Sequence, residues 1–195
     1  SNISVLRPDG PILGFDTGPG NMLMDAWTQS HFQQAYDADS RIASQGKVLP
    51  ELLQSLLNHP YFRMPAPKST GRDLFSLSWL NTYLSSLEAP QDVLRTLLEL
   101  TAVSLSTEIA GFAPKAVYVC GGGIRNQALM ARLSALLAPQ QAALHSTAEL
   151  QLDPQWVEAA AFGWLAACWI NRTPAGTHHA TGAHKPCILG AGHYA

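Results

Sequence analysis

The feature that most constrains the fold of this chain is the stretch Gly14–Asn21, with the sequence Gly-Phe-Asp-Thr-Gly-Pro-Gly-Asn. A short apolar run ends at Leu13, just before it, and residues 22–27, just after it, have helical composition. The pattern therefore predicts a buried strand, a tight turn and the start of a helix. Within the turn, Gly18 and Gly20 let the backbone take positive φ and approach a ligand closely.

Two polar residues in this stretch are candidates for chemistry. Asp16 is expected at the C-terminal end of the strand, where α/β sheets bind ligands, and a carboxylate there can be a metal ligand or a general base. A helix that opens at a glycine-rich turn also offers free N–H groups to an anion, and Asn21 or Asp25 could cap or charge its first turn. The alternative is a Gly/Pro turn in which Asp16 hydrogen-bonds its own loop. Both interpretations remain open at this point.

A second glycine-rich loop follows the β-branched run 116–120, which reads as a buried strand. Gly121, Gly122 and Gly123 remove every side chain where this strand meets a helix start, so a flat or phosphorylated ligand can lie on the backbone. The loop is neither the dinucleotide fingerprint nor a Walker A loop. The alternative is a tight packing turn, and Asn126 either contacts the ligand or caps the helix.

Three further groups of polar residues have a functional and a structural interpretation. Glu158 lies in the first turns of an Ala-rich helix, so it is either stabilised on the surface by the helix dipole or buried and functional. Asp37 and Asp39 could bind a cation or belong to a solvated loop. Lys68 and Arg72 bracket a Pro-rich loop and could hold an anion or lie in solvent.

Composition limits the class of protein. The chain has 195 residues, a formal net charge of −2, 47% hydrophobic residues and 13% charged residues. Because so few charges leave little for a solvated surface, we expect another domain or subunit to cover one face. A basic cluster for nucleic acid, a run of the ~20 apolar residues that span a membrane and a secretory signal are all missing from the sequence. Three scattered cysteines suit a reducing cytosol.

Hydrophobic periodicity predicts the fold class. The sequence is expected to form an α/β lobe with one mixed sheet flanked by helices. The sheet should contain strands at 3–6, 11–15 and 116–120, and helices starting near 21, 91, 124 and 156 should pack on it.

Several ordered motifs resemble one known family, the anhydro-N-acetylmuramic acid kinases. The similarity runs from Ser1 to the C-terminus and rests on the segments 14–21, 24–27, 68–72, 120–126, 156–159 and 181–183. The resemblance implies a ribonuclease H-like lobe of the actin/hexokinase/Hsp70 ATPase superfamily, whose members hold ATP between two α/β lobes.

The resemblance also implies a reaction and a set of residues. An aspartate activates water, which opens the 1,6-anhydro ring while the freed 6-oxygen takes the γ-phosphoryl group of ATP, giving N-acetylmuramic acid 6-phosphate for peptidoglycan recycling. Asp16 matches the general base and Glu158 a carboxylate that contacts the sugar. ATP and Mg²⁺ are the implied cofactors, with no metal ligand assigned, and a cytoplasmic homodimer is expected. The implied nucleotide-binding residues are Gly18, Gly20, Asn21, Gly121, Gly122, Gly123 and Asn126.

The sequence departs from the family pattern in one decisive respect. The family's first phosphate loop, of the form Gly-Thr-Ser-x-Asp-Gly, is not present, so residues 1–195 are expected to be the C-terminal lobe of a two-lobed sugar kinase and to have little activity alone. Two alternatives stay open. One is a lobe that binds nucleotide or sugar without catalysis, and the other is a metal-dependent hydrolase that uses Asp16 with Asp37 or Asp39.

Overall fold

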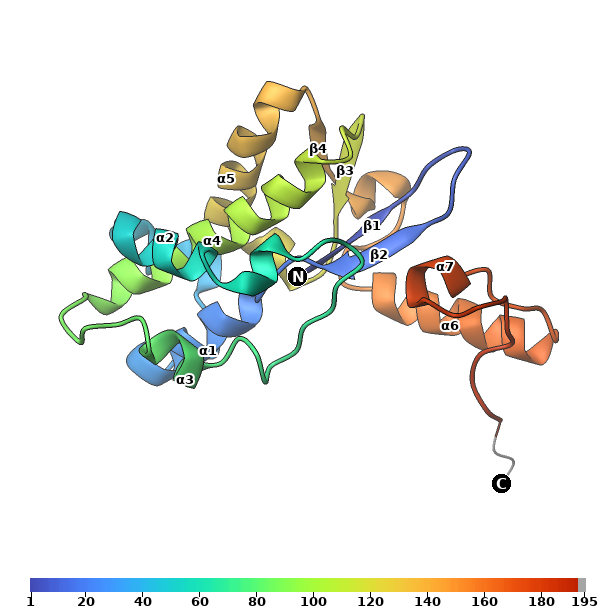
Figure 1. The fold of residues 1–195 in the computed structure, drawn as a ribbon, viewed down its shortest axis with the longest axis horizontal. Helices are drawn as coiled ribbons and strands as arrows, with labels where there is room; N and C mark the ends of the chain where they lie inside the picture. The colour runs from blue at the N-terminus through green and yellow to red at the C-terminus, as the bar shows by residue number, and fades with distance from the viewer. Residues whose placement is uncertain (193–195) are drawn as a thin grey trace.

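The computed structural model describes residues 1–192 as helices gathered around one central helix, with two small β-ladders beside them (Figure 1). Each ladder has two strands, so the fold is α/β with little sheet. The strands are β1 (Asn2–Val5), β2 (Leu13–Asp16), β3 (Ala116–Val119) and β4 (Ala143–Ser146). The helices are α1 (Asn21–Phe32), α2 (Pro50–Leu57), α3 (Leu77–Asn81), α4 (Pro90–Ala110), α5 (Gln127–Leu137), α6 (Val157–Ile170) and α7 (His178–Thr181).

Helix α4 is the centre of the main hydrophobic core. Its leucines recur at helical spacing, and Leu97 and Leu98 are fully buried against α1, α2 and α5. Leu56 of α2 and Trp27 of α1 belong to the same cluster. The indole N–H of Trp27 donates to the carbonyl of Pro90 at 2.9 Å, which ties α1 to the start of α4.

The helix starts follow local chemistry. Pro50 and Pro90 stand at the first positions of α2 and α4, where proline needs no N–H partner. The helix predicted from residue 124 begins later, at Gln127, because a short 3₁₀ turn occupies Gly122–Arg125. Asn126 then caps α5. The predictions for α1, α4 and α6 are confirmed to within a residue.

The prediction of one mixed sheet is wrong. β1 and β2 form an antiparallel hairpin in which Asn2 pairs with Asp16, whereas β3 and β4 form a separate parallel pair. The three predicted strands exist at nearly the expected residues. The sequence pattern did not specify which strand edges pair. Every strand is only four residues long, and the apolar side chains of both ladders pack into one shared hydrophobic layer whichever edges pair.

That shared layer is a second, smaller core under both ladders. Ile109 of α4 and Leu133 of α5 are buried within it. Ile3 of β1 and Val117 of β3 pack against the same cluster. The two ladders therefore lie on one apolar surface even though their backbones are not joined in one sheet.

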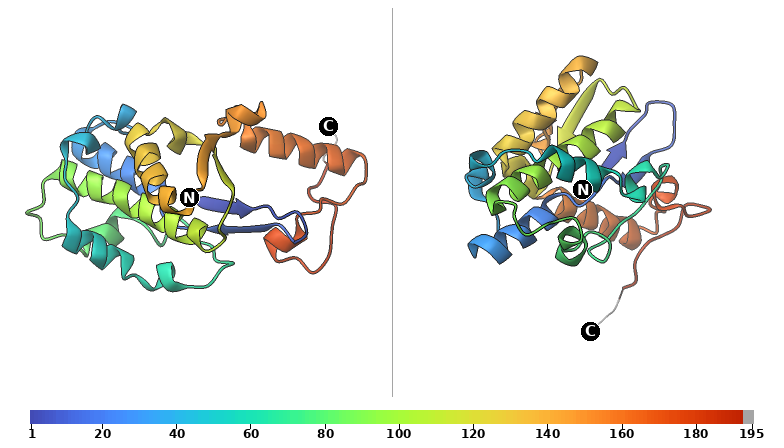
Figure 2. Two further views of the ribbon diagram at one scale, coloured as in Figure 1. Left: turned by 90° about the horizontal axis from the view of Figure 1, so that it is seen from above. Right: turned by 60° about the vertical axis from the view of Figure 1, so that its left-hand side comes forward.

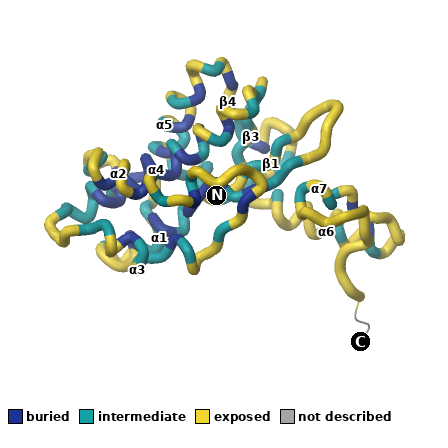
Figure 3. Tube along the Cα trace, viewed as in Figure 1, coloured by how far each residue is buried: buried dark blue, intermediate teal, exposed yellow. Residues whose placement is uncertain are grey.

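Helix α6 stands apart from the main body, at the end of the molecule where α7 also lies (Figure 2). The short helix α7 follows it and contacts β2, where a Cβ on Gly14 would lie 3.6 Å from the Cβ of Ala180. Most of α6 is exposed (Figure 3), although its residues are almost all apolar. Over residues 1–192, none of the helices combines the length and the apolar character that crossing a membrane requires.

Candidate functional site

The two glycine-rich turns, about a hundred residues apart in the sequence, meet in the structure. A Cβ placed on Gly123 would lie 3.5 Å from Oδ1 of Asn21, and one placed on Gly122 would lie 3.7 Å from its Nδ2. Asn21 is the first residue of α1, so the turn after β2 faces the turn after β3. This juxtaposition is the arrangement that a ligand site between the two turns needs.

A pocket of about 480 Å³ opens where these turns meet. Its apolar side is formed by Met24, Ala43 and Leu94, which belong to or border the main core. Its polar side combines the start of α1, the loop before Ser40, the second glycine turn and the segment before α6. The polar lining residues are Asn21, Asp25, Tyr36, Asp37, Asp39, Arg125, Asn126 and Gln155.

The second glycine turn is held in place by its backbone. Gly121 has a φ of 79°, which only glycine adopts without strain, and a Cβ there would meet no atom within 4 Å. Its N–H donates to the carbonyl of Pro154 at 2.8 Å, and its carbonyl accepts from Nε2 of Gln155 at 3.0 Å. The turn is thus an open ledge beside the pocket, as the ligand interpretation requires. Sequence reasoning missed Gln155, which no motif marks.

Asn126 caps helix α5, which is the alternative that the sequence offered to direct ligand contact. Its Oδ1 accepts from the N–H of Leu129 at 2.9 Å and from the hydroxyl of Ser40 at 2.5 Å. Ser40 is buried and itself accepts from the N–H of Ala128 at 3.2 Å. Asn126 therefore fixes both α5 and the loop before Ser40, and with them the shape of the pocket that it lines.

The acidic loop over the pocket is organised by hydrogen bonds. Both carboxylate oxygens of Asp37 accept backbone N–H groups, from Ile42 and Ala43, at 2.9 Å. Asp39 is exposed and pairs with Arg41 at 3.3 Å. Across residues 1–192, His, Cys, Asp and Glu side chains do not gather in threes as metal ligands would. The loop interpretation of Asp37 is the one that its contacts support.

Asp16 lies at the C-terminal end of β2, as predicted. Its Oδ2 accepts from the N–H of Thr70 at 2.9 Å and from the hydroxyl of Ser69 at 3.0 Å, while its own N–H donates to the carbonyl of Lys68 at 2.9 Å. The carboxylate thus holds a loop, and its Oδ1 accepts no hydrogen bond from residues 1–192. Asp16 does not line the pocket. It is linked to the pocket by the turn that follows β2 and ends at Asn21, which does line it.

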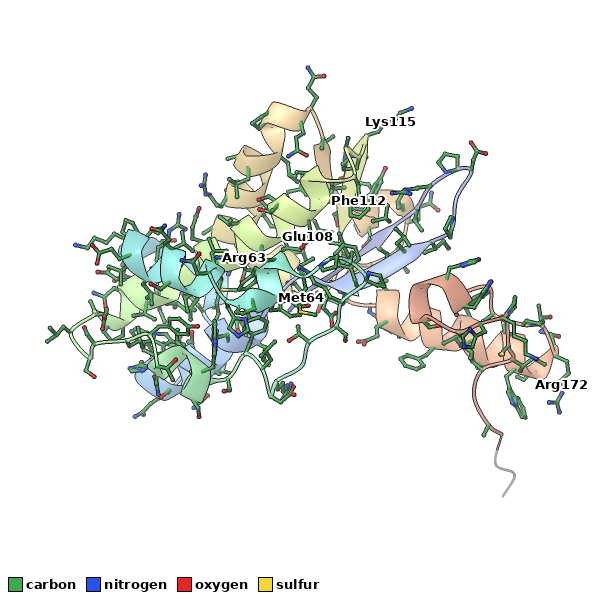
Figure 4. All side chains as sticks on the ribbon, in the orientation of Figure 1. Arg63, Met64, Glu108, Phe112, Lys115 and Arg172 are labelled. Carbon is green, nitrogen blue, oxygen red and sulfur yellow. The ribbon has the colours of Figure 1, made fainter. Side chains whose placement is uncertain are left out.

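The loop that Asp16 holds is anchored by a buried cation. The side chain of Lys68 is completely buried, and its Nζ donates to Oε1 of Glu108 at 2.6 Å and to the carbonyl of Tyr61 at 3.3 Å. Figure 4 labels Glu108 on α4. The hydroxyl of Tyr61 donates to the carbonyl of Asp16 at 2.9 Å, and burial, with the nearby carboxylates, raises the pKa of Tyr61 to about 12. Lys68 therefore has neither of its predicted roles: it holds no free anion and does not lie in solvent.

Five of the eight predicted binding residues do not line the pocket: Gly121 and Gly123 of the second turn, and also Gly18, Gly20 and Glu158. Gly18 is buried, and a Cβ on it would come within 3.1 Å of the Phe62 ring. Gly20 is buried with a φ of 59°, and a Cβ on it would come within 2.7 Å of the backbone nitrogen of Ser1. Glu158 is exposed in the first turn of α6, as expected if the helix dipole stabilises it on the surface. Of the predicted set, the pocket is lined by Asn21, Gly122 and Asn126.

Fold and pocket together define an α/β protein with a pocket beside two glycine-rich turns that precede helices, a geometry suited to phosphorylated ligands. Comparison with known proteins is more specific. A family model described as anhydro-N-acetylmuramic acid kinase matches residues 1–195, and the chain belongs to this family.

Individual relatives agree with the family match. An anhydro-N-acetylmuramic acid kinase of Neisseria meningitidis serogroup B is 61% identical over 196 residues, which cover 100% of this chain and 53% of the relative. Proteins of the same name from Pseudomonas syringae pv. tomato and Idiomarina loihiensis are 48% and 47% identical, over 98% of this chain and 53% and 52% of their own lengths. The chain thus spans about half the length of the curated relatives it matches.

Proposed function

We propose that this chain forms one lobe of an ATP-dependent kinase that opens the 1,6-anhydro ring of anhydro-N-acetylmuramic acid and phosphorylates its 6-oxygen. The family match over every residue is the observation that carries the proposal. The meeting of the two glycine-rich turns beside one pocket supports it, since Asn21 of the first turn and Gly122 of the second both line that pocket. The superfamily assignment to an actin-like lobe is part of the same proposal.

In this proposal the pocket takes the nucleotide. The ledge at Gly121–Gly123 lets the ligand approach the backbone, and Arg125 supplies a positive charge beside it. Mg²⁺ would arrive with the phosphates and neutralise part of their charge. Carboxylate oxygens on the pocket wall, such as those of Asp39, are ligands of the kind that Mg²⁺ binds, and no ligand is assigned.

Asp16 is the proposed general base. A base must be held within hydrogen-bond reach of the proton it accepts. Oδ2 is fixed by Thr70 and Ser69, so the carboxylate cannot rotate freely, and Oδ1 is left to accept a proton from water. Glu158 would contact hydroxyl groups of the sugar from the start of α6.

We further propose that the chain is the C-terminal lobe and that the rest of the polypeptide covers α6. Four large apolar side chains on and beside this helix are exposed: Trp156 by 65%, Phe162 by 67%, Trp164 by 49% and Ile170 by 70%. Apolar surface of this extent normally lies against protein. The relatives are about twice as long as this chain, so the additional half of such a polypeptide is the partner that we propose for this surface. The proposal includes a cytoplasmic homodimer of the two-lobed protein.

The half length also favours a second candidate, a lobe that binds nucleotide or sugar without catalysis. Phosphoryl transfer needs positioning and charge stabilisation from both sides of the phosphates, and one lobe provides only part of that. The hydrolase alternative has less support, because Asp37 commits both carboxylate oxygens to backbone N–H groups.

One experiment separates these candidates. A protein of the relatives' length that contains this sequence and the 195-residue chain alone are each incubated with ATP, Mg²⁺ and 1,6-anhydro-N-acetylmuramic acid. We expect ADP and the 6-phosphate only from the longer protein. Absence of product from the longer protein would refute the kinase proposal, and robust turnover by the short chain would refute the assignment as an incomplete lobe.

A further inference from the structure

One carboxylate in the pocket has no hydrogen-bond or ion-pair partner among the residues that the structure describes. Asp25 lies four residues after Asn21 on α1, so both side chains are on the face that borders the pocket. Asp25 is half-buried, yet it accepts no hydrogen bond and forms no salt bridge with any atom of residues 1–192. Burial raises the pKa of its carboxyl group.

The other two acids of the pocket are engaged. Asp37 binds two backbone N–H groups, and Asp39 pairs with Arg41. A partly desolvated carboxylate without a donor is costly, and a ligand that supplies donors removes that cost. Asp25 is therefore the acidic side chain in the pocket that is free to recognise a ligand.

Charge limits which part of a nucleotide can lie beside Asp25. Among the lining residues that the structure describes, the carboxylates of Asp25, Asp37 and Asp39 stand against one cation, Arg125, so phosphate groups are repelled from the acidic side of the pocket. The group that lies there must be uncharged and must donate hydrogen bonds, because an ionised carboxylate only accepts them.

A nucleotide has two such groups, and they differ in fit. The amino group of adenine stands next to the ring acceptor N1, which would face the second oxygen of the carboxylate and repel it. The ribose offers two adjacent hydroxyls, and both can donate to the two free oxygens of one carboxylate. The geometry favours the diol.

We propose that Asp25 binds the 2′- and 3′-hydroxyls of the nucleotide ribose and so selects ribonucleotides. This inference rests on the proposed function, since it takes the pocket ligand to be a nucleotide. It adds a specificity-determining residue on α1 to a site otherwise built from the two glycine turns.

The test compares nucleotide binding with and without the diol. Dissociation constants of ADP and 2′,3′-dideoxy-ADP are measured by calorimetry on the longer protein, for the unchanged sequence, for Asp25→Asn and for the matched control Asp9→Asn in the exposed β1–β2 turn. Two hydrogen bonds to a charged group predict that the unchanged protein and the control prefer ADP by roughly 10–100-fold. Asp25→Asn should reduce this preference to about 2-fold or less, mainly by weakening ADP binding.

Three outcomes would overturn the assignment. An unchanged preference in Asp25→Asn would show that the diol lies elsewhere, and equal weakening of both nucleotides would show a structural role. Failure of the unchanged protein to bind ADP would remove the nucleotide from this pocket. Binding is measured without turnover, so a protein that binds ADP with the predicted preference but forms no sugar phosphate would refute the proposed function and keep the role of Asp25. A melting temperature for Asp25→Asn no lower than that of the control verifies that the variant is folded.

Discussion

The buried pair between Lys68 and Glu108 anchors the loop that holds Asp16, so Glu108→Leu should destabilise the protein strongly. The variant leaves the ammonium of Lys68, whose side chain is 0% exposed, without a carboxylate; among residues 1–192 it keeps the carbonyl of Tyr61 at 3.3 Å and the ring of Tyr61, whose centroid lies 5.1 Å away. Removing one member of a buried ion pair costs about 3–5 kcal/mol. Since the Glu108 side chain keeps 21% of its exposure, solvent already weakens the pair, and a loss of about 3 kcal/mol is expected.

Urea denaturation followed by tryptophan fluorescence measures this loss. With a slope of about 2 kcal/mol per molar urea, the midpoint should fall by roughly 1.5 M. The double variant Lys68→Met/Glu108→Leu removes both charges, so it should recover most of the midpoint, because an apolar pair leaves no buried charge without a partner. A shift of less than about 0.5 M in Glu108→Leu, or a double variant less stable than the single one, would refute the argument.

Three further predictions concern single side chains. In the longer protein, Asp16→Asn should lower kcat by ~10²–10⁴-fold with little change in nucleotide affinity, and an unchanged kcat with a lowered melting temperature would leave Asp16 only its loop role. Burial lowers the pKa of His59, whose Nδ1 accepts from the N–H of Tyr61, below the value of 6.5 that it has in the unfolded chain. Because the unfolded chain then takes up the proton more readily, the contribution of neutral His59 to the free energy of unfolding is fully present above pH 6.5 and is lost as the pH falls below it. The melting temperature should therefore fall less between about pH 7 and pH 5.5 in His59→Asn than in the unchanged protein, and equal slopes would contradict this. Asn126→Ala should cost about 1–2 kcal/mol by removing the α5 cap, whereas Gln127→Ala at the next position should be near neutral; equal losses in urea denaturation would refute the capping role.

The local elements were predictable because their causes are local. Spacing of leucines sets the buried face of α4, and Pro50 and Pro90 set where α2 and α4 begin. The strand, turn and helix around Asp16 follow from an apolar run that ends at glycines. The start of α5 was predicted too early, at residue 124, because hydrophobic periodicity does not detect the 3₁₀ turn that precedes the cap formed by Asn126.

What the sequence by itself determined is therefore the family, the positions of helices and strands, and the two glycine-rich turns. Only the tertiary structure decided that these turns face each other, that Lys68 is buried against Glu108, and that Asp25 lines the pocket without a hydrogen-bond partner from residues 1–192. The physical reason is range. Periodicity, proline and glycine act within a few residues, whereas strand pairing, burial of a charge and the lining of a pocket depend on which distant segments the packed core brings into contact.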